Sequence, residues 1–122
     1  MPSTDIVITP TDLRTEADAL ADAAARGLVA TANDFVGKVE DWHWHDFAAT
    51  VYVLEGESGV DYDDGVTLRV AAGNIFHQPA GVVHKDVPGV TYRAVFAFDT
   101  DPQTWTQPLN KPVTTSATSS IS

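Results

Sequence analysis

Two histidines one residue apart, His43 and His45, have the residue type and spacing that most directly suggest chemistry. Side chains alternate between the two faces of an extended strand, so both imidazoles would lie on one face and Trp42 and Trp44 on the other. Two imidazoles in this arrangement can bind one metal ion at nitrogen–metal distances of about 2.0–2.1 Å. A bare His-x-His pair is also compatible with two surface or core histidines that bind no metal.

Glycines, a proline and a third histidine stand at fixed intervals around this pair. The sequence reads Gly37-x5-His43-x-His45 up to Gly56, and after residues 57–72 it continues as Gly73-x5-Pro79-x-Gly81-x2-His84. This order resembles the two motifs of the cupin superfamily, G-x5-H-x-H-x3,4-E-x6-G and G-x5-P-x-G-x2-H-x3-N. The resemblance covers residues 37–84. It implies an all-β fold, a double-stranded β-helix or jelly-roll barrel.

The sequence departs from the cupin motifs at two positions. The family's glutamate ligand falls at position 49, which is Ala49, and its asparagine falls at position 88, which is Pro88. The resemblance therefore implies three metal ligands, His43, His45 and His84, without the fourth. Three imidazoles leave coordination positions open, as in catalytic rather than structural sites. Cupin enzymes with three histidines and no glutamate include dioxygenases that use Fe(II). The implied cofactor is therefore a divalent metal ion, Fe(II) first, with Zn, Ni or Mn as alternatives.

The same resemblance sets the functional expectation. It implies a metal-dependent, dioxygenase-like enzyme that acts on a small carbonyl or oxygenated substrate. The alternative is a non-enzymatic cupin that binds or senses a small molecule in the same pocket. A degenerate pocket whose histidines hold no metal is also compatible with the sequence. Cupins commonly pair through a sheet face or edge, so a homodimer is expected.

Further residues are candidates for the surroundings of the metal. His77 is a second-shell group, an additional ligand or a surface histidine, and Gln78 is the alternative inward residue of the same strand. Arg93 interrupts an apolar strand, where it could pair with a substrate carboxylate inside the barrel or lie on the surface. Strand parity from position 49 turns Tyr52 outward. The predicted pocket lining is Phe47, Ala49, Val51, Val53, Phe76 and Arg93.

Hydrophobic periodicity predicts the elements that must position these residues. The start of the chain favours a helix, with a capping-box pattern in Thr9 to Asp12, Pro10 at the first helical position and Gly27 at the end. Short strands separated by turn signals are predicted at residues 28–35, 40–45, 50–54, 59–62, 66–70, 75–78, 83–87 and 91–98. This spacing indicates a β-sandwich or barrel. The predicted organisation is an N-terminal helical cap at 1–28, a barrel at 29–98, and a C-terminal arm with a polar tail at 99–122.

Composition restricts the classes of protein and partner. The chain has 122 residues, of which 43% are hydrophobic, and this suits a single domain with one core. A formal net charge of −10 argues against a nucleic-acid partner. The sequence has no apolar run near the ~20 residues of a membrane helix and no secretory signal pattern, so no membrane partner is expected. Cysteine is absent, which excludes thiolate ligands and disulfides, and a cytoplasmic location is expected.

Overall fold

The secondary structure is dominated by antiparallel strands. The computed structural model describes residues 6–13, 15–105 and 109–113. In this part of the chain there are nine strands, one α-helix and one short 3-10 helix. The strands are β1 (Val7–Pro10), β2 (Val29–Val36), β3 (His43–Trp44), β4 (Ala49–Tyr62), β5 (Thr67–Ala71), β6 (Asn74–Gln78), β7 (His84–Asp86), β8 (Thr91–Phe98) and β9 (Lys111–Pro112). The helices are α1 (Glu16–Ala25) and the 3-10 helix η2 (Pro102–Thr104).

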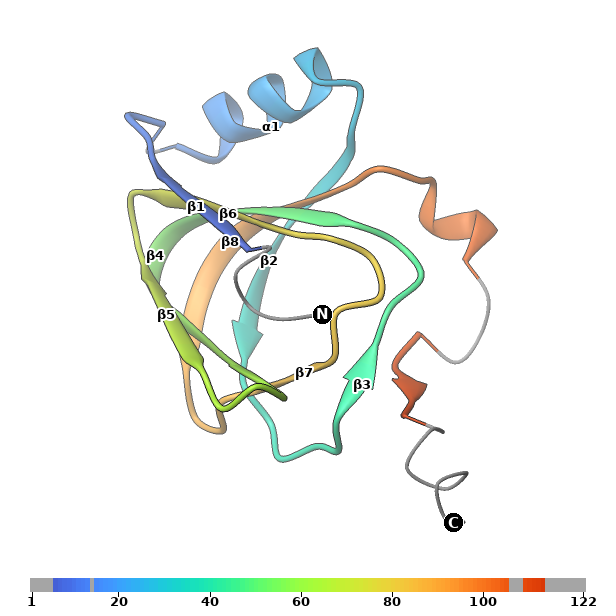
Figure 1. Ribbon diagram of the computed structural model, residues 1–122. Helices are drawn as coiled ribbons and strands as arrows, with labels where there is room; N and C mark the ends of the chain where they lie inside the picture. Colours follow the sequence, from blue (N-terminus) through green and yellow to red (C-terminus); the bar gives the residue numbers. More distant parts are fainter. Residues whose placement is uncertain (1–5, 14, 106–108, 114–122) are drawn as a thin grey trace, which may run out of the picture.

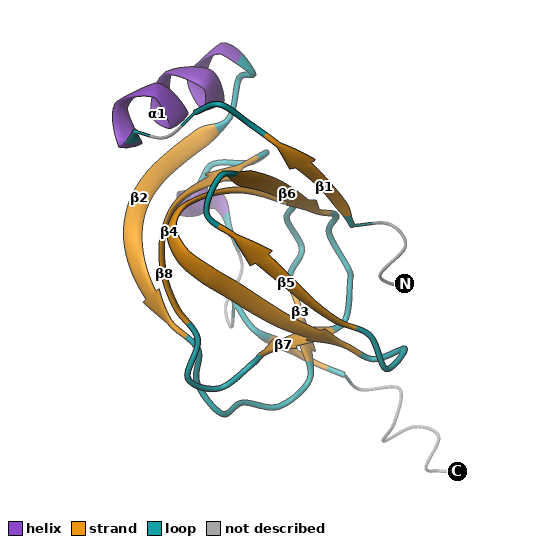
Figure 2. Ribbon diagram, turned by 90° about the vertical axis from the view of Figure 1, so that its left-hand side faces the viewer, coloured by secondary structure: helices purple, strands orange, loops and turns teal. Residues whose placement is uncertain are grey.

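Two curved sheets share the long strand β4. One sheet has the order β1-β6-β4-β8-β2. The other has the order β5-β4-β7-β3-β9. Figures 1 and 2 show the two sheets curving around a common interior, with α1 outside the first sheet. The all-β jelly-roll prediction is thereby confirmed.

A bulge within β4 allows one strand to serve both sheets. The sequence predicted two strands, 50–54 and 59–62, with a turn between them, but Ala49–Tyr62 is continuous. The register against β8 shifts between Val53 and Glu55. Gly56 follows with a φ of +77°, a left-handed conformation that glycine adopts without steric cost. A Cβ at this position would lie 2.4 Å from the carbonyl oxygen of Thr91. The glycine-rich stretch therefore bends a strand and does not reverse the chain.

Side chains along the strands of the first sheet point alternately into the barrel interior and toward the helix. Val51, Val53 and Phe76 are buried together in the interior. Tyr52 points outward, as strand parity predicted, but it is buried because α1 packs over it with Ala19 and Ala23. The small alanine side chains let the helix lie close to the sheet. The Tyr52 hydroxyl also donates a 2.7 Å hydrogen bond to the Asp22 carboxylate of the helix.

The N-terminal prediction was partly wrong. Val7–Pro10 is an edge strand paired with β6, not the start of a helix, so it belongs to the barrel and not to a cap over 1–28. The helix begins at Glu16, where the side chain of Thr15 accepts a 3.1 Å hydrogen bond from the backbone N–H of Asp18. Pro10 lacks a backbone donor, which an edge strand tolerates. Residues 1–5 of the predicted cap lie outside the described residues.

No helix in the described ranges is both long enough and apolar enough to span a membrane.

Candidate metal centre

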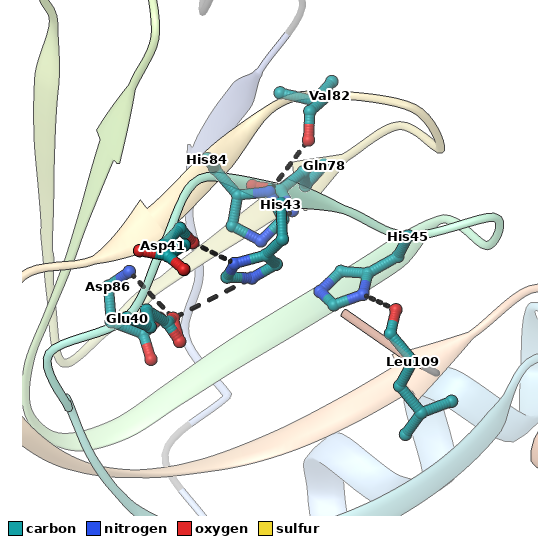
Figure 3. A network of polar contacts seen from close by, with 9 residues as sticks. All are labelled: Glu40, Asp41, His43, His45, Gln78, Val82, His84, Asp86 and Leu109. Carbon is teal, nitrogen blue, oxygen red and sulfur yellow. Dashed lines mark hydrogen bonds and ion pairs between the residues drawn. The ribbon is translucent and has the colours of Figure 1, made fainter. Parts of the chain in front are cut away.

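The three motif histidines come together where β3 and β7 pair. His43 lies directly opposite His84 in the antiparallel register, and His45 follows β3. The N–H of Gly81 donates a 2.8 Å hydrogen bond to the carbonyl of His45, so the turn before His84 is attached to the His-x-His segment. The ring centroids lie 4.5 Å (His43–His84), 5.0 Å (His45–His84) and 5.2 Å (His43–His45) apart. One potential ligand nitrogen of each ring lies within 4.8 Å of the other two. Figure 3 shows the rings gathered in this way.

Backbone carbonyls set the tautomer of all three rings. In each histidine, Nδ1 lies within hydrogen-bond distance of a carbonyl oxygen, and a carbonyl only accepts, so Nδ1 carries the proton. The partners are Asp41 for His43 at 2.9 Å, Leu109 for His45 at 2.8 Å and Val82 for His84 at 2.8 Å. In the neutral imidazole, Nε2 is then the nitrogen with the free lone pair. Two of the carbonyls are local, whereas Leu109 is far from His45 in the sequence.

Burial favours the neutral form of His45 and His84. His84 is 6% exposed, and desolvation lowers its pKa to about 4. Desolvation also lowers the pKa of His45, although its hydrogen bond to Leu109 opposes this shift. Neutral imidazole is the form that ligates metals. Protons therefore compete with a metal ion for Nε2 of His84 only at a lower pH than they would at an exposed histidine.

The interior next to the histidines is apolar at position 49 and polar at Gln78. Ala49 pairs with Gln78 of β6 and Phe98 of β8, and its methyl group packs against the apolar interior. Oε1 of Gln78 accepts a 2.8 Å hydrogen bond from the Tyr62 hydroxyl, which turns the amide nitrogen toward His84, 3.4 Å from both ring nitrogens. Burial raises the pKa of Tyr62, so its hydroxyl stays a donor. Gln78 is thus the inward residue of β6.

Two predicted site residues lie outside the barrel. His77 is exposed on the opposite face of β6 from Gln78, and its Nδ1 shares a 3.0 Å hydrogen bond with the hydroxyl of Thr50. It is a surface histidine and contacts none of the three motif histidines. Arg93 was predicted in the pocket lining, but it binds Glu16 at 2.5 Å and Asp34 at 3.1 Å on the outer surface. Residues of β8 alternate, and Ala94 takes the inward position.

The C-terminal segment that follows β8 forms one wall of the site. Phe47 is buried between two rings, with centroid distances of 4.8 Å to His45 and 3.7 Å to Trp105. Beyond Leu109, β9 pairs with β3, and the carbonyl of Pro112 accepts a 3.2 Å hydrogen bond from Nε1 of Trp44. Strand pairing, ring stacking and the Leu109 carbonyl therefore all join this arm to the His-x-His segment.

Two carboxylates beside the histidines were missed by the sequence reasoning. Oε2 of Glu40 lies 3.8 Å from Nε2 of His43 and accepts a 3.3 Å hydrogen bond from the backbone N–H of Asp86. Burial and the neighbouring Glu40 carboxylate raise the pKa of Asp86 to about 7. A cavity of about 340 Å³ is lined by Phe35, Val36, Lys38, Glu40, His43, His45, His84, Asp86 and Asn110. Asp86 had a usable signal, because it shares strand parity with His84. Glu40 falls in the unspecified spacer of the first motif and had none.

Comparison with known families agrees with this arrangement. Residues 36–86 match the family model of the cupin domain. The chain contains a small cupin domain. The matched range includes all three histidines of the site, so the resemblance drawn from the sequence is confirmed. Among curated proteins, no significant match to this cupin is found.

Solved structures show the same fold at low sequence identity. A protein of Neisseria meningitidis is 22% identical with a TM-score of 0.51, over 59% of this chain and 73% of its own. A protein of unknown function from Pseudomonas syringae is 18% identical with a TM-score of 0.53, over 58% of this chain and 30% of its own. A protein provisionally described as ethanolamine utilization protein Q, from Salmonella typhimurium, is 21% identical with a TM-score of 0.50, over 86% of this chain and 71% of its own. At these identities the comparison concerns the cupin fold alone.

Proposed function

We propose that this cupin binds one divalent metal ion through Nε2 of His43, His45 and His84. The observation that carries the proposal is the shared orientation of the rings: every Nδ1 donates to a carbonyl, so the lone pair of each ring is on Nε2. The Gln78 amide makes only a long contact of 3.4 Å with Nε2 of His84. Ligating histidines usually donate their other ring nitrogen to such a partner, which fixes the ring and its tautomer. Imidazole ligands suit Fe, Zn and Ni. Fe(II) is the ion that we propose first, with Zn, Ni or Mn as alternatives.

We further propose that the centre belongs to a dioxygenase-like enzyme for a small carbonyl or oxygenated substrate. When bound, the ion would supply Lewis acidity and, as Fe(II), redox chemistry. The cavity of about 340 Å³ is of the size that holds a small molecule. Phe35 and Val36 give it apolar surface, Lys38 and Asn110 give it polar groups, and the amide of Gln78 offers a donor near His84. The chain would thus orient the substrate by both apolar and polar contacts.

Metal analysis of protein purified without chelator tests the first proposal. We expect about one ion per chain in the parent and in His77→Ala, whose histidine lies on the surface. His43→Ala and His84→Ala should hold much less than one. Circular dichroism will confirm that each variant is folded. A folded parent that holds no ion after supplementation with Fe(II), Zn, Ni or Mn would refute the metal centre.

Oxygen uptake with a panel of small diketones, thiols and catechols tests the enzyme. Uptake that depends on the metal and is lost in His43→Ala would support the dioxygenase proposal. Saturable binding of a panel member without any turnover would favour the alternative, a cupin that binds or senses a small molecule.

We also propose a homodimer in the cytoplasm. The edge strand β1 has its far side unpaired among the described residues, and Val7 and Ile8 are 56% and 41% exposed, so a second chain could add to this edge. The absence of cysteine is compatible with a reducing compartment, and such a compartment would keep an Fe(II) centre in its reduced state. Sedimentation velocity should give a dimer mass, and a monomer at all concentrations would contradict the assembly.

A further inference from the structure

We propose that Glu40 is a fourth, anionic ligand of the metal centre and replaces the carboxylate that position 49 lacks. The proposal rests on the three-histidine site proposed above. Position 49 cannot contribute, because the methyl group of Ala49 has no metal-binding atom. Glu40 lies in the segment between β2 and β3, three residues before His43. The same ligand type would therefore reach the ion from a different part of the barrel.

The distance between Glu40 and His43 fits ligands of one ion. Two atoms that each lie about 2.1 Å from a shared ion can be at most about 4.2 Å apart. Oε2 of Glu40 lies 3.8 Å from Nε2 of His43, and Nε2 is the nitrogen of His43 that remains free. The distance is compatible with one ion bound by these two atoms. The three histidines alone form the group whose ligand atoms all lie within 4.8 Å of one another, so the Glu40 side chain would have to rotate inward to bind the same ion as His45 and His84. Figure 3 shows the Glu40 carboxylate beside the His43 ring, on the side toward Asp86.

Glu40 also faces the space that an ion would occupy. Its side chain is only 19% exposed. Together with His43 and Asn110, it lines both the cavity of about 340 Å³ and an adjoining cavity of about 680 Å³. The hydrogen bond from the N–H of Asp86 is long, at 3.3 Å. Because a carboxylate has about four acceptor sites, Glu40 can keep this contact while it ligates a metal.

Charge gives a reason for a carboxylate here. Three neutral imidazoles leave the full charge of a divalent ion uncompensated in a largely buried site, which is unfavourable. Among the neighbouring acids, Asp46 is exposed and pairs with Lys111 at 3.7 Å, and Asp41 is exposed and contacts His43 through its backbone carbonyl. Glu40 has the side chain directed at a ligating nitrogen. A mixed imidazole and carboxylate set is also typical of non-haem Fe(II) oxygenases.

Titration of metal-free protein with Co(II) or Zn(II) tests the role of Glu40. Glu40→Gln keeps the shape of the side chain and removes its charge, and we expect its affinity to be lower than that of the parent by about tenfold or more. Glu57→Gln makes the same substitution at a half-exposed glutamate that pairs with Arg69 at 3.7 Å, away from the three histidines. Its affinity should stay within about threefold of the parent, because an exposed charge contributes little. The visible spectrum of bound Co(II) should change in Glu40→Gln and not in Glu57→Gln, which reports the ligand set directly.

The outcomes separate this proposal from the one on which it rests. A parent that binds no ion removes both proposals. A parent and a folded Glu40→Gln with equal affinities and identical Co(II) spectra would leave the three-histidine site standing and overturn the role of Glu40. Equal losses in Glu40→Gln and Glu57→Gln would also overturn it, because they would indicate a general effect of charge.

Discussion

Burial of His84 should make the metal-free protein gain stability as the pH rises through the acid range. The pKa of His84 falls from 6.5 to about 4 in the folded chain, because desolvation disfavours the imidazolium form. Between these values the unfolded chain binds a proton that the folded chain does not. Stability therefore rises with pH in this window and is lost as the pH falls from 6.5 toward 4. One pKa unit corresponds to about 1.4 kcal/mol, so the full contribution is about 3 kcal/mol.

The titration of Asp86 changes the stability with pH in the opposite direction. Its pKa is raised from 3.8 to about 7, so the folded chain binds the extra proton and loses stability as the pH rises through that range. The parent alone would show the two effects partly cancelled. The difference between the parent and His84→Asn isolates the histidine, since Asp86 is present in both. Asparagine also keeps an N–H donor near the carbonyl of Val82, to which His84 is bound.

Urea unfolding in the presence of chelator, followed by tryptophan fluorescence, gives the free energies of unfolding. Work at pH 5–7 avoids the region near the isoelectric point of about 4.4, where the chain carries little net charge. Over this range the free energy of unfolding of the parent, minus that of His84→Asn, should rise by about 2 kcal/mol. A difference that stays constant within about 0.5 kcal/mol from pH 5 to 7 would refute the claim that His84 is desolvated.

Three further predictions follow from the structure. Removal of residues 109–122 should weaken metal binding by about tenfold, because the Leu109 carbonyl that orients the imidazole of His45 is lost. Leu109→Ala keeps this carbonyl and should bind metal like the parent in the same titration. Gly56→Ala should cost about 3 kcal/mol in urea unfolding, from backbone strain and a clash, whereas Gly65→Ala, with open space around its Cβ, should cost only about 1 kcal/mol. Arg93→Ala should leave metal content and ligand binding unchanged, because this side chain lies outside the barrel.

The predictions from sequence that the structure confirms concern local patterns. Strand β8 has the predicted bounds, and Tyr52 takes the face that alternation from position 49 assigns to it. Bounds and faces of a strand depend on few neighbouring residues, so periodicity is sufficient to predict them. The three histidines converge because His43 and His84 occupy opposed positions of paired strands, and this was expected from the resemblance to the cupin motifs, not from periodicity.

The parts that were missed depend on the packing of distant segments. Strand parity places the side chains of His77 and Gln78 on opposite faces of β6. Parity alone does not determine which of the two side chains points into the barrel. The glycine before Ser58, Gly56, is compatible with either a turn or a bend in the chain. Only the pairing of β4 with strands of both sheets shows that the chain bends there. The carbonyl of Leu109 beside His45 joins residues far apart in sequence, and a carbonyl has no residue-specific signal.

The absent glutamate at position 49 has a further consequence if Glu40 is a ligand. A carboxylate at position 49 would project from the first residue of β4, which is paired on both sides, with β6 and with β8, and it could move little. Glu40 belongs to a segment between strands, so its carboxylate can change its distance to the ion at small cost. The histidines, each bound through Nδ1, would remain in place. Glu40 would then be the one ligand of the set whose position can adjust, while the three imidazoles would hold the ion in place.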